Sequence, residues 1–395
     1  MTNSVRRPEF PYLDGLRGAS AMLVVAYHAF LFTGHTGDAA EAMPLWELVI
    51  GMGYIGVAVF IVLSGYVLML PVTMTPDLTF RGGMGRFFKR RARRILPPYY
   101  AALLFGLLLI FLVPVMSQPA DTAWDSKLPV TIGGLVSHLL LVQDFSPEWI
   151  FQINGPLWSV AVEWQIYFVM ALALLPLWRR IPAPAIVSVL LVVTVASDFL
   201  NIGAFIHPWF VALFACGMWA AQLTFSVRAP KRLGLLVLAT AAVSVALMLG
   251  TKVVGLPTTA IAETTAGITV ALALVWLGRR EVAGRPAAIS RFFRARPMMF
   301  LGLISYSVYL FHSPILALGN LLLLPLGLPT VVQYLVMTFA CIPVAVFVSW
   351  LMFLLVERHF LNTRQKHATT ELAEQRPATH TEDAAAPSET SDTRA

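Results

Sequence analysis

Three ionisable side chains near the start of the chain have types and a spacing that suit chemistry. They lie in the apolar stretch YLDGLRGASAMLVVAYHAF, with Asp14 and Arg17 at one end and His28 at the other. Arg17 and His28 are 11 residues apart, close to three turns of an α-helix, so both fall on one face, about 16 Å apart along the axis. Asp14 precedes Arg17 by three residues, a spacing at which helix side chains pair.

The chemistry of these side chains suggests a helix with two different ends. A guanidinium fork suits phosphate oxygens, and an imidazole accepts a proton near pH 7. The rival interpretation is that Arg17 reaches the lipid headgroups with Asp14 as its partner, and that His28 is an interior histidine satisfied by hydrogen bonds. The shared helix face favours the functional interpretation.

The composition predicts where this helix must lie. The chain has 395 residues, of which 58% are hydrophobic and 12% charged, and its mean hydropathy is +0.74. The apolar residues form runs of about 20, the length that crosses a bilayer. We therefore predict an all-α polytopic membrane protein and exclude a single soluble domain. Cys216 and Cys341 lie in apolar runs and predict neither a disulfide framework nor a zinc site.

The apolar runs predict about ten transmembrane helices. They lie near residues 12–33, 48–70, 97–117, 156–178, 182–200, 206–226, 233–250, 258–277, 297–319 and 330–356. Residues 132–142, in the longest connection, are apolar enough to lie at the interface or to re-enter the membrane.

The distribution of basic residues predicts the orientation. With a cytoplasmic N-terminus, 25 of the 28 Lys and Arg residues are inside, and only Lys127 and Lys252 are outside. We expect both termini in the cytoplasm, a short segment 1–11, a membrane domain 12–361 and a disordered tail 362–395. This asymmetry accounts for the formal charge of +7, so no nucleic-acid partner is needed. The chain is expected in the plasma or inner membrane.

A second basic feature is the cytoplasmic stretch RGGMGRFFKRRARRILPPYY. Arg90, Arg91 and Arg94 can fall on neighbouring helix positions just before the third span, where Pro97 and Pro98 mark the start of the membrane segment. Guanidinium groups so placed suit phosphate oxygens. A topology anchor or a patch for anionic lipid is the alternative.

Later spans carry further polar residues at membrane depth. GPLWSVAVEWQIYF holds Trp158 and places Glu163 roughly 10 Å below the outer surface. LGLISYSVYLFHSPIL carries three more, and FIVLSGYVL a fourth, namely Ser305, Tyr306, His312 and Ser64. The alternative to a functional role is helix packing, or for Glu163 a structural hydrogen bond with a hydroxyl. Together with the basic stretch, they suggest a path from a basic inner mouth to a proton-transfer site near the outer side, where His28, Glu163 and His312 gather.

These motifs, in their order, resemble the acyltransferase family 3 of membrane proteins. The motifs are YLDGLRGASAMLVVAYH, GYIGVAVFIVLSGYVL, RRARRILPPYY, GPLWSVAVEWQIYF, LGLISYSVYLFHSPI and LLVERHF, and the resemblance covers roughly residues 12–361. It implies ten membrane helices and transfer of an acyl group, often acetyl, from cytoplasmic acyl-CoA to a hydroxyl of a carbohydrate, glycolipid or glycosylated small molecule. It implies no metal and no permanently bound cofactor. We expect no appended extracytoplasmic hydrolase-like domain.

The resemblance also implies roles for individual residues. His28 matches the family's essential first-helix histidine, and Glu163 matches the glutamate of a tryptophan-serine-glutamate motif. The residues that match the family's donor-binding positions are Arg17, Arg90, Arg91 and Arg94; Glu357 and Arg358 match a motif that ends the domain. Trp164 and His359 depart from the family pattern, which leaves the substrate open.

The mechanism expected from this resemblance places His28 at the centre. His28 acts as general base on the acceptor hydroxyl or as acyl carrier, and Glu163 orients or charge-balances it. Asp14, Ser64, Trp158, Ser305, Tyr306 and His312 are expected to support the site. A transporter or flippase for a glycolipid or metabolite is the alternative function; it predicts paired structural repeats, and the sequence shows none.

Overall fold

The computed structural model describes residues 10–361 except 201–202, 204–205, 228, 231 and 255–258. Most of the expected N-terminal segment and the expected disordered tail, residues 1–9 and 362–395, lie outside the described residues. All regular secondary structure of the described residues is helical, and no strand occurs among them. The fold class predicted from the sequence, an all-α polytopic membrane protein, is confirmed.

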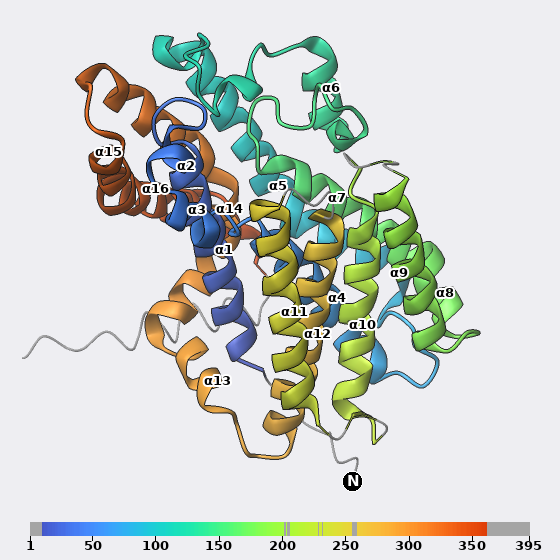
Figure 1. Cartoon of the computed structure of the whole chain (residues 1–395). Helices are drawn as coiled ribbons and strands as arrows, with labels where there is room; N and C mark the ends of the chain where they lie inside the picture. Colours follow the sequence, from blue (N-terminus) through green and yellow to red (C-terminus); the bar gives the residue numbers. More distant parts are fainter. Residues whose placement is uncertain are drawn as a thin grey trace, which may run out of the picture. The chain divides into compact units, whose positions relative to one another are not determined.

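The longer helices follow the chain in the order of the expected spans (Figure 1). They are α1 (Tyr12–Leu31), α3 (Pro44–Ile50) with α4 (Ile55–Thr73), α5 (Gly83–Leu112), α7 (Leu157–Val169) with α8 (Leu175–Trp178), α9 (Ala183–Phe199), α10 (Trp209–Phe225), α11 (Leu233–Val253), α12 (Thr259–Val282), α14 (Arg296–Leu323), and α15 (Thr330–Val336) with α16 (Ile342–Leu355). One turn of π-helix, Met170–Leu174, joins α7 to α8, and another, Met337–Cys341, joins α15 to α16.

Seven helical segments of the described chain are long and apolar enough to cross a membrane. They cover the second, third, fourth and last four of the expected spans. The fifth and sixth spans are the shorter apolar helices α9 and α10, and the first is α1, which carries Asp14 and Arg17. Each expected span therefore has a helix.

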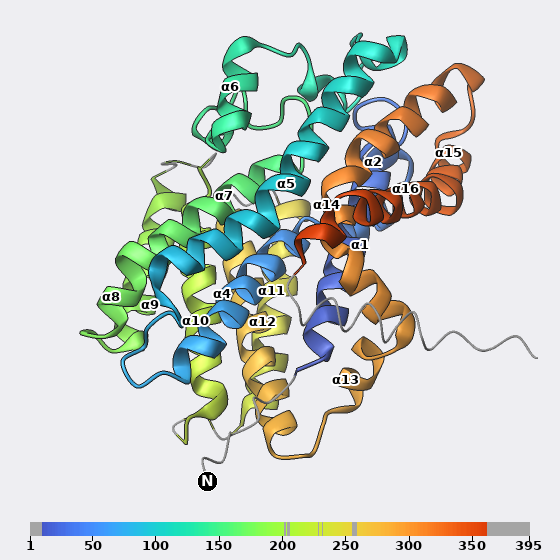
Figure 2. The ribbon, with the colours of Figure 1, turned by 180° about the vertical axis from the view of Figure 1, so that it is seen from behind.

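The two ends of the bundle differ in the segments that they carry. The short helix α6 (Ile132–Leu140) belongs to the connection expected outside, and α13 (Ala288–Phe293) belongs to one expected inside. Figures 1 and 2 place α6 and α13 at opposite ends of the bundle. This arrangement agrees with the expectation that the two connections lie on opposite sides of the membrane.

Helix α6 is amphipathic, as an interfacial segment should be. Ile132, Val136, Leu139 and Leu140 are exposed and follow a spacing that places them on one face. Tyr99 and Tyr100 of α5 donate their hydroxyls to the carbonyls of residues 138 and 139, at 2.9 and 2.8 Å. The helix is thus tied to α5 while its apolar face stays uncovered.

Helix α5 differs from the expected third span. It begins at Gly83 rather than near residue 97, so the basic stretch is part of a 30-residue helix. Pro97 and Pro98 lie inside it. Each proline removes an amide donor from the helix, so the two carbonyls one turn earlier lose their amide partners. Local propensity alone favours a helix boundary here, but the helix continues past both prolines.

Close helix contacts at glycine hold the helices that carry the polar side chains. A methyl group on Gly18 of α1 would overlap the backbone of α14 at Gly302, and one on Gly302 would overlap the carbonyl of Asp14. Gly65 of α4 and Gly217 of α10 face the backbone of the other helix in the same way. Small residues permit such approach between membrane helices.

We expect Gly18→Ala to destabilise the protein by about 1–3 kcal/mol, because the added methyl group meets backbone rather than a flexible side chain. Thermal unfolding of the purified protein in detergent measures the change. The matched control is Gly85→Ala in α5, where the new methyl group has no neighbour within 4 Å. That control should be neutral or stabilising by up to about 1 kcal/mol. Equal melting temperatures for the two variants would contradict the packing argument.

Candidate active site

Two cavities lie between the helices that carry the predicted site residues. The inner cavity, of about 90 Å³, is lined by Arg17, Ser64, Arg91, Arg94, Glu163 and Tyr167 among others. The outer cavity, of about 560 Å³, is lined by His28, Lys127, Trp158, His207 and Glu263 among others. Val57 and Tyr309 line both cavities, so the two spaces share one wall.

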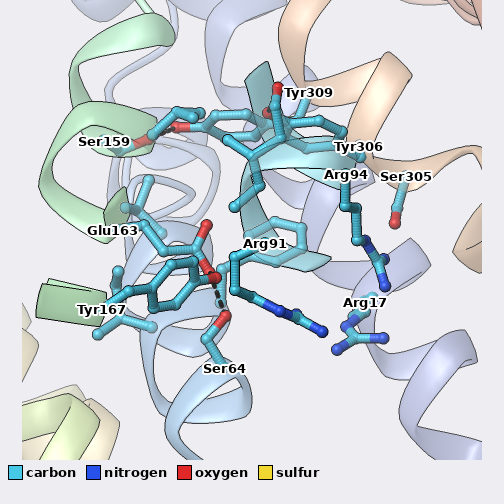
Figure 3. Close-up of a pocket in the computed structure, with 15 residues that line it drawn as sticks. Arg17, Ser64, Arg91, Arg94, Ser159, Glu163, Tyr167, Ser305, Tyr306 and Tyr309 are labelled. Atoms are coloured by element: carbon cyan, nitrogen blue, oxygen red, sulfur yellow. Dashed lines mark hydrogen bonds between the residues drawn. The ribbon is translucent and has the colours of Figure 1, made fainter. Parts of the chain in front are cut away.

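Three guanidinium groups gather on one side of the inner cavity (Figure 3). Arg17 comes from α1, and Arg91 and Arg94 come from successive turns of α5. The expected ion pair is present, since Arg17 Nη1 lies 3.1 Å from Asp14 Oδ1. The buried Nε–H of Arg91 makes no hydrogen bond to another described residue. The cavity therefore offers several N–H donors to an anion.

Arg90 is separated from the other two arginines of the motif. It is not among the residues that line the inner cavity, and its Nη1 lies 3.5 Å from the carbonyl oxygen of Arg81. Successive residues of a helix point about 100° apart, so Arg90 and Arg91 cannot share one face. Arg90 was expected to lie beside Arg91 and Arg94, but of these three arginines only Arg91 and Arg94 line the inner cavity in the structure.

Glu163 lies on the opposite side of the inner cavity from the arginines (Figure 3). Its Oε1 accepts hydrogen bonds from the hydroxyl of Ser64 and, at 2.6 Å, from that of Tyr167. The sequence placed Glu163 beside His28, but the structure gives it these two hydroxyl partners instead. The hydroxyl pairing was the structural alternative for this glutamate. Glu163 and His28 line different cavities.

Hydroxyl groups of α14 line the rest of the inner cavity. Ser305 Oγ donates to the carbonyl of Gly302 at 2.8 Å, and the Tyr306 hydroxyl donates to the carbonyl of Ile95 at 3.0 Å. The Ser305 bond stays within α14, whereas that of Tyr306 ties α14 to α5. The hydroxyl of Tyr309, in the shared wall, is hydrogen-bonded to Ser159 Oγ.

His28 and His312 meet in the interior, although 284 residues separate them. His28 Nδ1 lies 2.9 Å from His312 Nε2, and His312 Nδ1 lies 2.9 Å from the carbonyl oxygen of Val308. A carbonyl oxygen only accepts, so His312 Nδ1 carries a proton and, in the neutral ring, Nε2 accepts. His28 Nδ1 must then donate, which leaves the lone pair of His28 on Nε2. His312 thus holds the position in which the sequence placed Glu163.

An aromatic wall lines the outer cavity. Trp158 stacks on His207, with ring centroids 4.1 Å apart and an interplanar angle of 25°, and on Phe210 at 5.8 Å. Stacked rings bury large apolar surfaces and keep a flat outline. Trp158, expected from the sequence to support the site, therefore belongs to the outer cavity rather than to the arginines.

Lys127 is a residue of the outer cavity, although the sequence marks it only as one of two cations expected outside. It ends the short 3₁₀ turn Asp125–Lys127, is only 8% exposed, and lines the cavity with His28. Its Nζ donates to Ser126 Oγ at 2.6 Å and lies 3.4 Å from the carbonyl oxygen of Ala123. Burial lowers the pKa of Lys127 to about 8. No local pattern in the sequence marks this lysine as buried.

The motif that ends the domain ties the last helix to α14. Glu357 is buried and accepts hydrogen bonds from the backbone N–H of Ser307, at 3.1 Å, and from its hydroxyl, at 2.6 Å. Glu357 thus fixes the stretch of α14 that carries Tyr306 and Tyr309 on either side of Ser307. It lies outside both cavities.

Comparison with known proteins gives one family match and several partial relatives. The acyltransferase domain family matches residues 10–354. The chain is similar to the acyltransferase MdmB of Streptomyces mycarofaciens, with 31% identity over 177 residues, 43% of this chain and 39% of that protein. It is similar to the O-acetyltransferase OatA of Staphylococcus aureus, with 24% identity over 190 residues, 47% of this chain and 28% of that protein.

A third relative is the peptidoglycan O-acetyltransferase OatA of Listeria monocytogenes, with 26% identity over 188 residues, 46% of this chain and 27% of that protein. These matches cover less than half of each relative's own length. No solved structure matches the chain.

The buried position of Lys127 predicts a pH-dependent stability. The amine has a pKa of about 8 in the folded protein and 10.5 when exposed, so the unfolded chain binds a proton that the folded chain has released between these values. The free energy of unfolding therefore rises with pH in this window through Lys127. We expect Lys127→Met to melt at a higher temperature than the wild type near pH 7, and the difference to shrink by pH 10. A difference that is constant from pH 7 to 10 would contradict this.

Proposed function

We propose a function on one established premise: this chain belongs to the acyltransferase family whose domain covers residues 10–354. It is an integral membrane O-acyltransferase that moves an acyl group, acetyl in the simplest case, from cytoplasmic acyl-CoA to a hydroxyl. The acceptor is a carbohydrate, a glycolipid or a glycosylated small molecule, and the enzyme works in the plasma or inner membrane. Two relatives are named O-acetyltransferases, which supports transfer to oxygen.

The donor is held at the inner cavity. Arg17, Arg91 and Arg94 present guanidinium groups to one space, and such forks suit the phosphate oxygens of coenzyme A. Asp14 keeps Arg17 in place through their ion pair. Glu163, Ser64 and Tyr167 form the opposite side of this cavity, where their hydrogen bonds fix its outline.

The acceptor is held at the outer cavity, where His28 acts as the base. His28 Nε2 takes the proton of the acceptor hydroxyl as its oxygen attacks the thioester carbonyl carbon. A C–O bond forms, the C–S bond breaks, and the departing coenzyme A thiolate takes the proton. His312 is a positioning residue, since its Nε2 accepts from His28 Nδ1 and so selects the reactive tautomer.

The observation that carries this proposal is the shared wall of the two cavities. Val57 and Tyr309 face both spaces, with guanidinium groups on one side and His28 on the other. A thioester presented at this wall is reached from the outer cavity while its phosphate-bearing part stays with the arginines. The 11-residue spacing of Arg17 and His28 places both on one face of α1, as the chemistry requires.

We expect His28→Ala to lower acyl transfer by at least about 100-fold, the range that a positioned general base contributes. The purified protein is incubated with labelled acetyl-CoA and cell-envelope or metabolite extracts, and mass analysis identifies what gains the acyl group. His35→Ala, an exposed histidine, is the matched control and should retain activity. Full activity of a folded His28→Ala protein would refute the role of the histidine. Movement of a solute without consumption of acyl-CoA would favour a transporter.

The donor site gives a second expectation from two adjacent arginines of α5. Arg91→Gln should raise the KM for acyl-CoA by about tenfold or more, because a charge-assisted hydrogen bond is lost. Arg90→Gln, one residue earlier and outside the inner cavity, should leave this KM within about twofold. Initial rates at varied acyl-CoA concentration measure both. If the two variants behave alike, the motif acts as a general positive surface rather than through the cavity.

A further inference from the structure

Lys127 is a buried cation with no carboxylate partner. The ion pairs of the described residues are Arg17–Asp14, Lys252–Glu47 and Arg294–Glu281, and Lys127 is in none of them. Its ammonium group has the Ser126 hydroxyl, the Ala123 carbonyl and the ring of Phe151, with Nζ 5.4 Å from the ring centroid. Dipoles and a ring compensate a buried charge only in part.

The side chain is nevertheless held firmly in the cavity wall. The carbonyl of Lys127 accepts a hydrogen bond from the Ile153 N–H at 3.1 Å, and its amide donates to the Trp124 carbonyl at 2.8 Å. Trp124 is fully buried and its Nε1 donates to the Met116 carbonyl at 3.0 Å. The connection between α5 and α7 is therefore built so that the aliphatic stem of Lys127 runs inward. A lysine without a function here would point outward into water.

The other polar groups of the outer cavity do not neutralise Lys127. The acidic side chain among them, Glu263, accepts a hydrogen bond from Trp209 Nε1 at 2.6 Å and lies beyond ion-pair distance of the lysine. The remaining polar groups are the side chains of Tyr27, His28, Thr36, Tyr54, Thr122, Ser126, Trp158, His207, Tyr309 and Ser313, which carry no negative charge at neutral pH. The cavity thus holds a cation to which an anionic ligand can bind.

We propose that Lys127 binds an anionic oxygen group, a carboxylate or a phosphate, that the acceptor carries in addition to the hydroxyl that is acylated. This inference rests on the proposed function for the identity of the acceptor, but not for the existence of the anion site. The acceptor is then an acidic glycan, glycolipid or glycosylated compound. Its ring has a flat surface in the stack of Trp158 and His207, and its charge keeps it in the cavity that holds His28.

A labelling experiment on the full-length protein tests the site without using its activity. The purified protein reacts with a small neutral amine reagent, the N-hydroxysuccinimide ester of acetic acid, and peptide mass analysis follows each lysine. Lys252 is the matched control, because it is the other cation expected outside and is paired with Glu47. Glucuronate, glucose 6-phosphate and glucose are added as probes. They share a pyranose ring but differ in carrying a carboxylate, a phosphate or no charge.

Glucuronate, glucose 6-phosphate or both should protect Lys127 at a concentration about tenfold lower than glucose does, and none should protect Lys252. The arm that protects distinguishes a carboxylate from a phosphate ligand. Equal protection by glucose, or protection by none of the three, overturns the proposal. Lys127→Arg keeps the charge and should retain an anion-dependent rise in melting temperature, whereas Lys127→Met should lose it.

Kinetics separate this role from a role in the chemical step. Once an acceptor has been identified, Lys127→Met should raise the KM for that acceptor about tenfold over the wild type. The variant should leave kcat and the KM for acyl-CoA within about twofold. A tenfold loss of kcat at unchanged acceptor KM would instead place Lys127 at the developing oxyanion and overturn the proposal. If anion-selective protection is found without acyl transfer to any acceptor, the proposed function fails and the anion site stands. Acyl transfer that does not depend on the charge of the acceptor overturns the anion site and leaves the proposed function in place.

Discussion

The cost of placing charge inside a bundle of apolar helices governs this structure. Helix α1 carries an arginine and a histidine on one face, and neither can face lipid without a large penalty. Both are turned inward, where Arg17 pairs with Asp14 and His28 with His312. That inward face is possible because Gly18 and Gly302 let α1 and α14 approach until backbone meets backbone. The close contact brings the second histidine to the first.

Two chemically different cavities follow from the same arrangement. The arginines of α1 and α5 line one cavity, and His28 and Lys127 line the other. The wall between them consists of apolar Val57 and of Tyr309, whose hydroxyl is held by Ser159. The structure thus separates a cavity lined by guanidinium groups from a cavity lined by His28. The proposed function assigns the donor to the first cavity and the acceptor to the second.

The two cations expected on the outer side, Lys252 and Lys127, have different partners. The difference sets stability against function. Lys252 has Glu47 as an ion-pair partner. Lys127 is more deeply buried and has only a hydroxyl, a carbonyl and an aromatic ring. An uncompensated buried charge lowers stability, and folded proteins retain such groups chiefly where a ligand uses them. The connection between α5 and α7 carries this cost, and it places a cation in the cavity that His28 lines.

The sequence by itself determined the features that depend only on the order of residues along the chain. Apolar run length gave the spans, the positive charges gave the orientation, and helical periodicity placed Asp14 with Arg17 and both Arg17 and His28 on one face. Only the tertiary structure decided which residues meet across helices. Run length and charge locate a residue in depth, but they do not say which helix stands next to which or how each is rotated. Hence His312 rather than Glu163 is the partner of His28, and Lys127 enters the cavity, both through contacts between residues far apart in the chain.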